Sequence, residues 1–205
     1  MWRDINSEFF PGTLPRPFFR AWPTSVVERE SNVTLKCGSP FQRAAFRLGK
    51  LNSTGSRQQL MSSSGKDAEL LLTDLQPQDA GRYFCTYKTT ASQGWSESEH
   101  LQLVVTGSLP KPSLSFTLDP KGHKVTLQCL IPYNGTEHIA TALLKSGHSE
   151  PLQVKLRITP ADLVLWTVTI QDTGNYSCVY YQWDFPYLGS FPSSRLEFRM
   201  KDEGP

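Results

Sequence analysis

Long apolar segments are missing from this sequence of 205 residues, of which 38% are hydrophobic. Its longest apolar runs span only a few residues, whereas a helix that crosses a bilayer needs about 20. The opening residues, MWRDINSEFFPG, also lack the apolar segment of a signal peptide. Taken alone, these absences favour a cytosolic protein.

An excess of either charge is missing as well, since 21 Lys and Arg residues stand against 19 Asp and Glu residues. No run of Lys and Arg forms a basic stripe, which argues against a nucleic-acid partner. Long amphipathic helical stretches are absent, and the chain is too rich in Val, Leu and aromatic residues to be disordered. The 15 Pro and 14 Gly residues favour many turns.

Catalytic and metal-binding patterns are absent too. Zinc sites usually contain closely spaced Cys or His pairs, and this sequence has none. It also lacks a glycine-rich phosphate loop, a Gly-x-Ser-x-Gly elbow and a spaced pair of acids. We therefore expect no enzyme, no metal ion and no cofactor. The four histidines are scattered along the chain, at His100, His123, His138 and His148.

What is present is a repeat built around four cysteines. Cys37 and Cys85 lie 48 residues apart, and Cys129 and Cys178 lie 49 apart. The segment NVTLKC that ends at Cys37 matches KVTLQC before Cys129, and DAGRYFC matches DTGNYSC before the later cysteine of each pair. The chain is therefore a tandem of one module.

The repeated segments have the alternation of strands. Apolar and polar residues alternate over 33–37 and 125–129, and again over 83–87 and 176–180. A Cys on an early strand and an Asp-x-Gly-x-Tyr-x-Cys corner near the end are typical of an immunoglobulin β-sandwich. We expect one disulfide per sandwich; a metal site or four free thiols is the alternative.

Disulfides indicate an oxidising compartment, and four Asn-x-Ser/Thr sequons agree with it. We therefore expect an extracellular protein whose leader is missing from this chain. Of the sequons, the two in turn-like surroundings are the better candidates, and the one nearest the last cysteine is expected to be hindered. The predicted glycosylation sites are Asn32, Asn52, Asn134 and Asn175.

The strand after the first cysteine of each module lacks the usual Trp, so Phe46, Leu48 and Leu143 are expected to cover the disulfides. This feature, the start LPKPSLS at 109–115 and the ending WSESEHLQLVVTG at 95–107 resemble the leukocyte-receptor-complex immunoglobulin receptors. The resemblance covers about residues 14–199 and favours two-domain activating members as relatives.

The resemblance implies an all-β chain of two tandem immunoglobulin-like (C2-type) β-sandwich domains. It places domain one at 14–106 and domain two at 107–200. Residues 1–13 are expected to be a disordered extension, and 201–205 the remnant of a stalk.

The resemblance further implies the ectodomain of an immune-cell, myeloid receptor that regulates leukocyte activation from the plasma membrane as a single-pass protein. Its partner would be a protein ligand, with collagen favoured over MHC class I or another cell-surface protein. An activating form would signal through an adaptor such as the Fc receptor gamma chain. The alternative is a secreted binding or decoy protein.

The aromatic stretch YYQWDFPYLGSFP at 180–192 supplies the candidate ligand contacts. Tyr180 continues the inward face of its strand, whereas Tyr181 is expected on the sheet surface. Exposed aromatics on a rigid scaffold are favoured anchors. Contact with a ligand and packing against the chain itself remain open for the loop tip, whereas for Trp95 packing against the sheet is favoured over contact. The predicted contacts are Tyr181, Trp183, Asp184 and Phe185.

One departure from the family pattern lies in the same stretch. The final strand of these domains usually starts with Trp-Ser, as Trp95-Ser96 does in domain one. Domain two has Gly189-Ser190 instead. The packing around this loop should therefore differ between the two domains.

Overall fold

The computed structural model describes residues 13–121, 124–132, 138–157, 161–166 and 170–199. Contacts divide the chain into two compact units. The first comprises 34–71, 82–101 and the described part of 1–20; the second comprises 21–33, 72–81 and the described part of 102–205. No helix within the described ranges is long and apolar enough to cross a membrane. Residues 1–12 of the predicted extension and all of the predicted stalk at 201–205 lie outside the described residues, and the boundary near residue 106 stays a prediction.

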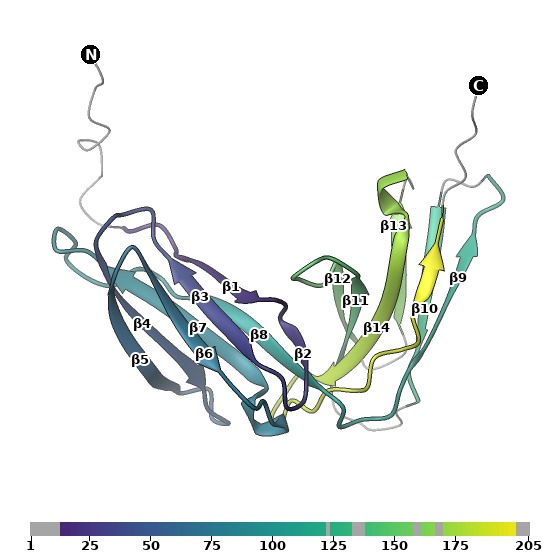
Figure 1. The fold of residues 1–205 in the computed structure, drawn as a ribbon, viewed down its shortest axis with the longest axis horizontal. Coiled ribbons are helices and arrows are strands. Elements are labelled where there is room, and N and C mark those ends of the chain that lie inside the picture. Colours follow the sequence, from purple (N-terminus) through teal and green to yellow (C-terminus); the bar gives the residue numbers. More distant parts are fainter. Residues whose placement is uncertain (1–12, 122–123, 133–137, 158–160, 167–169, 200–205) are drawn as a thin grey trace, which may run out of the picture. The chain divides into compact units, whose positions relative to one another are not determined.

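The first eight strands form the two sheets of an immunoglobulin sandwich (Figure 1). One sheet has the order β1-β3-β6 and the other β2-β8-β7-β4-β5, in which β2 runs parallel to β8. The strands are β1 (Phe18–Trp22), β2 (Val26–Glu28), β3 (Val33–Gly38), β4 (Ala44–Leu51), β5 (Arg57–Gly65), β6 (Asp67–Leu72), β7 (Gly81–Lys88) and β8 (Glu99–Thr106).

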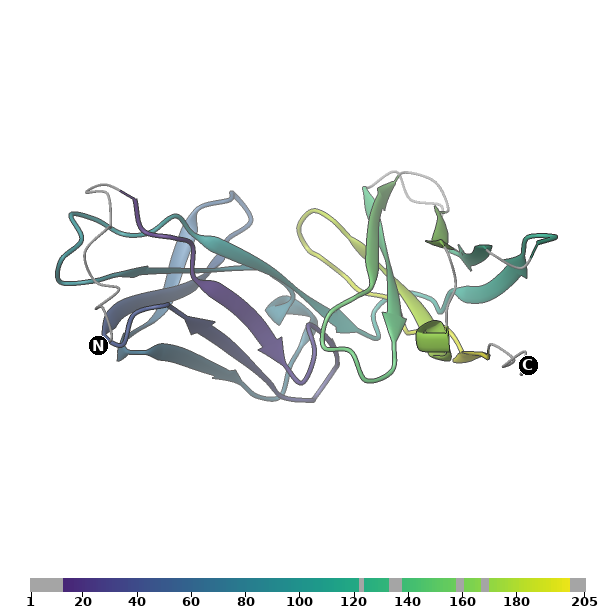
Figure 2. The same ribbon diagram turned by 90° about the horizontal axis from the view of Figure 1, so that it is seen from above.

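The remaining strands repeat the arrangement, and Figure 2 shows the same strands from a second direction. Their sheets have the orders β13-β10-β9 and β12-β11-β14-β15. A short 3-10 turn precedes β7 and another precedes β14, namely η1 (Pro77–Asp79) and η2 (Ile170–Asp172). The strands are β9 (Ser113–Leu118), β10 (Lys124–Leu130), β11 (Ile139–Lys145), β12 (Gln153–Arg157), β13 (Ala161–Trp166), β14 (Gly174–Gln182) and β15 (Leu196–Phe198).

Each sandwich contains one disulfide that joins its two sheets. Cys37 on β3 is bonded to Cys85 on β7, and Cys129 on β10 is bonded to Cys178 on β14. The aliphatic side chains expected to cover the bridges do so, because Leu48 pairs with Cys85 and Leu143 with Cys178 in the strand register. Phe46, Leu48 and Leu143 are all buried, as predicted from the missing Trp.

The Asp-x-Gly-x-Tyr-x-Cys corner has the predicted geometry in the second sandwich. The hydroxyl of Tyr176 donates a hydrogen bond to the carbonyl oxygen of Asp172. Gly81 and Gly174 have φ angles of 139° and 155°, which side chains other than glycine rarely adopt. Burial, with a smaller contribution from the charge of Asp172, raises the pKa of Tyr176.

We expect Tyr176→Phe to lower the free energy of unfolding by about 1 kcal/mol, because a buried hydrogen bond is lost without a change in shape. Urea denaturation would measure the difference. Tyr187→Phe is the matched control, since no hydrogen bond of the Tyr187 hydroxyl is found among the described residues. Equal stability of the two variants would contradict a stabilising corner.

Candidate functional site

The loop tip singled out by the sequence closes the end of β14. The Gln182 N–H donates to the Leu188 carbonyl oxygen at 3.0 Å, and the Gln182 side-chain oxygen accepts from the Leu188 N–H at 3.1 Å. Inside this pair, the Tyr187 N–H donates to the Asp184 carbonyl oxygen at 2.9 Å. Residues 183–187 therefore form a turn held by its own hydrogen bonds.

The three side chains at this tip differ in exposure. Phe185 is 64% exposed, and its ring lies perpendicular to that of Tyr187, with 6.3 Å between ring centroids. Asp184 lies 3.2 Å from Nδ1 of His138, which makes an ion pair when His138 is protonated. Trp183 is half-buried and packs against an apolar cluster of the second unit. Phe185 is thus the aromatic side chain of the tip with the most accessible surface.

Tyr181 lies in that apolar cluster, and its predicted exposure is wrong. Its side chain is only 3% exposed, because the outer face of β14 is covered by apolar side chains that precede the second sandwich in the chain. When the second repeat is considered alone, its strand alternation predicts that this face is exposed to solvent. The other buried members of the cluster are Val26, Val104, Ala140, Ala142 and Val179.

An exposed apolar row on β12 was missed by the sequence reasoning. Leu152, Val154 and Leu156 are 37%, 47% and 50% exposed, whereas the polar Gln153 and Lys155 between them are half-buried. Val154 and Leu156 lie on β12, which is the edge strand of its sheet, and Leu152 directly precedes that strand. The alternation in PLQVKLR was the available signal, but such alternation usually marks apolar side chains that face the core.

The row and the apolar cluster share one face of the sheet. Val154 pairs with Ala142 and Leu156 pairs with Ala140 in the register of β11 and β12. Both alanines belong to the cluster against which Trp183 packs. The exposed row therefore extends an apolar surface that other residues of the second unit cover only in part.

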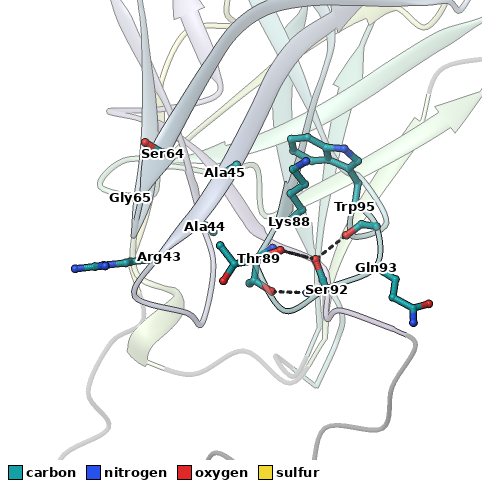
Figure 3. A pocket seen from close by; sticks show the side chains of 12 residues that line it. Arg43, Ala44, Ala45, Ser64, Gly65, Lys88, Thr89, Ser92, Gln93 and Trp95 are labelled. Carbon is teal, nitrogen blue, oxygen red and sulfur yellow. Dashed lines mark hydrogen bonds between the residues drawn. The ribbon is translucent and has the colours of Figure 1, made fainter.

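A separate hollow of about 670 Å³ opens at one end of the first sandwich, between β4, the end of β5 and the loop after β7 (Figure 3). Ala45 lies at its floor, paired in register with Ser64 on one side and Lys88 on the other. Trp95 forms part of the wall.

Trp95, for which the sequence favours packing against the sheet, is half-buried, and two cations lie over its ring. The guanidinium of Arg47 lies 3.9 Å from the centroid of a Trp95 ring, and Nζ of Lys88 lies 5.2 Å from it. A cation over an indole face is attracted by the negative electrostatic potential that the π electrons give to that face. Figure 3 shows Lys88 beside the indole. The contacts hold Trp95 at the edge of the hollow.

Comparison with known proteins places this fold among receptors, although no protein-family model matches the chain. The mouse T-cell-interacting, activating receptor on myeloid cells protein 1 is 37% identical over 93% of this chain and 68% of its own length. The human osteoclast-associated immunoglobulin-like receptor is 33% identical over 98% of the chain and 72% of its own length.

The chain belongs to the leukocyte-receptor-complex immunoglobulin-like receptors. Human V-set and transmembrane domain-containing protein 1 is 61% identical over 45% of this chain, and that match covers 39% of the relative's length. The solved human OSCAR ligand-binding domain is 31% identical, with a TM-score of 0.46 over 91% of this chain and 100% of that one. These relatives belong to a non-enzymatic receptor family.

The departure from this receptor family's Trp-Ser pattern has a structural explanation. The Ser side-chain oxygen keeps one function in both sandwiches: Ser96 accepts from the Tyr87 N–H at 3.1 Å, and Ser190 accepts from the Tyr180 N–H at 3.0 Å. The preceding position differs, because Gly189 lies against the chain leading into the second sandwich. Serine is thus kept where its hydrogen bond is needed.

Three of the four sequons of this receptor chain lie in described positions. Asn32, Asn52 and Asn175 are exposed, and Asn134 lies outside the described residues. The side-chain oxygen of Asn52 accepts hydrogen bonds from the N–H groups of Thr54 and Ser56. Glycosylation at all four stays a prediction. No group of three or more His, Cys, Asp or Glu residues able to hold a metal occurs in the described ranges.

Proposed function

We propose that this chain is the ligand-binding ectodomain of a myeloid-cell surface receptor that regulates leukocyte activation. The proposal rests on one observation, the large apolar side chains that the second unit leaves exposed: Val154 and Leu156 beside the buried alanines of β11, and Phe185 at the loop tip after β14. Contiguous exposed apolar surface on a soluble domain marks interaction sites. Among the relatives, one is named an activating receptor on myeloid cells and another an osteoclast-associated receptor.

Collagen is the ligand we place first, ahead of MHC class I and other cell-surface proteins. Its three chains are polyproline-II-like and rich in imino-acid rings. Surfaces that recognise such extended chains use aromatic and aliphatic side chains, and the chain loses little entropy on binding. Phe185, Trp183 and the row on β12 provide side chains of this kind. An array of triple-helical collagen peptides, probed with this chain fused to Fc, tests the ligand.

We expect Phe185→Ala to weaken collagen-peptide binding about tenfold, because an exposed aromatic anchor is lost, and to leave the melting temperature unchanged. Trp183→Ala should lower both the affinity for the collagen peptide and the melting temperature, since Trp183 also packs on the apolar cluster. Binding by surface plasmon resonance and melting by calorimetry separate the two effects. Phe18→Ala, which removes a 49% exposed aromatic from the first unit, is the control.

Unchanged binding by Phe185→Ala, or an equal loss in Phe18→Ala, would exclude the tip as the contact.

The membrane-anchored form would be a single-pass receptor, and an activating one would use an adaptor such as the Fc receptor gamma chain. The alternative is a secreted binding protein. An apolar run of about 20 residues encoded downstream of residue 205 would distinguish the first from the second.

A further inference from the structure

The charged side chains that line the hollow of the first sandwich are all positive. Arg43 and Lys88 line it, and Arg47 lines a second hollow of about 460 Å³ that shares Ala45, Lys88 and part of its wall with the first. No Asp or Glu occurs in either lining. Within the described ranges, none of the three cations has a carboxylate within ion-pair distance. This end of the first unit therefore favours a negatively charged ligand.

The rest of the lining combines short polar side chains with Ala, Gly and the indole of Trp95. Hydroxyl and amide groups from β5 and the loop after β7 face the same space as Trp95, and the largest aliphatic side chain in the first hollow is Ala. Peptide-binding grooves instead offer apolar pockets for side-chain anchors. A lining of hydroxyls, amides and one indole suits a sugar ring, which carries hydroxyl groups on its edge and C–H groups on its faces. The polar groups are those of Ser64, Thr89, Thr90, Ser92 and Gln93.

The loop that forms one wall is held by its own hydrogen bonds. The Ser92 hydroxyl donates to the Thr89 carbonyl oxygen at 3.0 Å and lies 2.9 Å from that of Gly94, while the Ser92 N–H donates to the Thr89 hydroxyl at 3.1 Å. Figure 3 shows these contacts beneath Lys88 and Trp95. A wall ordered before binding loses less entropy when a ligand is bound.

We propose that this hollow binds an acidic sugar residue of a glycan. The ammonium of Lys88 and the guanidinium of Arg47 attract its carboxylate or sulfate. The indole of Trp95 lies beside the bound ring, and the hydroxyls of Ser64 and Thr90 in the lining bond to its hydroxyls. The site is separate from the apolar face of the second sandwich, so one molecule can bind a glycan and a protein ligand through different units.

Surface plasmon resonance of the full chain tests the site with sialyllactose and with a heparin hexasaccharide. We expect saturable binding that weakens as salt is added, because the contact is between charges. Lys88→Gln should weaken it about tenfold, and Lys88→Arg should keep it. Lys121→Gln removes the same charge from an exposed position of the second unit and should have no effect. Binding of sialyllactose would show that a single carboxylate is enough, whereas binding of the heparin hexasaccharide alone would show that the site needs the denser charge of a sulfated sugar; either result supports the site.

The proposal is overturned if neither saccharide binds at millimolar concentration, or if Lys88→Gln binds as well as the unchanged chain. Preference for a poly-glutamate peptide over both saccharides would replace the glycan with an acidic protein. Phe185→Ala should leave saccharide binding intact, and Lys88→Gln should leave collagen binding intact. Failure of the glycan site and failure of the receptor proposal are therefore distinguishable.

Discussion

Replacing the second bridge, as Cys129→Ala with Cys178→Ala, is expected to lower the free energy of unfolding of its sandwich by about 4 kcal/mol. The two cysteines are 49 residues apart, and an unfolded chain without the crosslink regains the entropy of a loop of that size. A domain of this size has a total stability of about 5–15 kcal/mol. The loss should therefore unfold a large fraction of this sandwich at physiological temperature.

The bridge also lies inside the core of that sandwich. Cys129 and Cys178 are 2% and 0% exposed and pack with side chains from both sheets, so two alanines leave a cavity as well as a freer unfolded chain. The other core members include Val125, Leu127, Leu143, Tyr176 and Phe198.

Urea denaturation followed by near-ultraviolet circular dichroism would measure the loss. The matched control replaces Cys37 and Cys85, because it should destabilise the first sandwich by a similar amount. A double variant of the second bridge with an unchanged urea midpoint would show that the packing of this core, and not the crosslink, supplies its stability.

Gly189→Ala is expected to lower the melting temperature by far more than the addition of one methyl group usually does. A Cβ atom at Gly189 would lie 2.5 Å from the carbonyl oxygen of Val105 and 3.1 Å from Cγ1 of Val104. Overpacking of this kind typically costs about 1–3 kcal/mol. The backbone cannot withdraw easily, because the N–H groups of Ser108 and Leu109 both donate to the Gly189 carbonyl oxygen.

The matched control is Gly94→Ala. A Cβ atom at Gly94 would meet nothing within 4 Å, so this change should leave stability equal or slightly higher through the unfolded chain. Gly189→Trp, which restores the Trp-Ser pattern of Trp95-Ser96, should be worse than Gly189→Ala. Differential scanning calorimetry compares the variants. A Gly189→Ala melting temperature equal to that of Gly94→Ala would contradict a tight approach to Val105.

The parts of the fold that followed from the sequence are those set by short spacings. An Asp-x-Gly-x-Tyr-x-Cys segment brings its glycine, tyrosine and cysteine into one corner, because the residues are close in the chain. Alternation likewise places Tyr87 and Tyr180 inward, and both are fully buried. Because the segment occurs twice, the same reasoning predicts the corner, the paired cysteines and the missing Trp in both sandwiches.

The candidate surfaces could be predicted only in part. The sequence pointed to the tip at 183–185, and Phe185 is exposed there, but it also placed Tyr181 on the surface. It gave no reason for the outward row at Leu152, Val154 and Leu156. Nor could it relate Arg47 to Trp95, because side chains 48 positions apart in the chain meet only through the order of the strands.

By itself, then, the sequence determined the class of fold, the module repeat, the bridging cysteines and the receptor family, because each depends on residue types at short or repeated intervals. Tertiary structure alone decided which faces are covered: Tyr181 is buried by Val26 and Val104, and Gly189 is needed where Val105 approaches. Burial of a sheet face depends on what packs across it, and those residues come from distant parts of the chain.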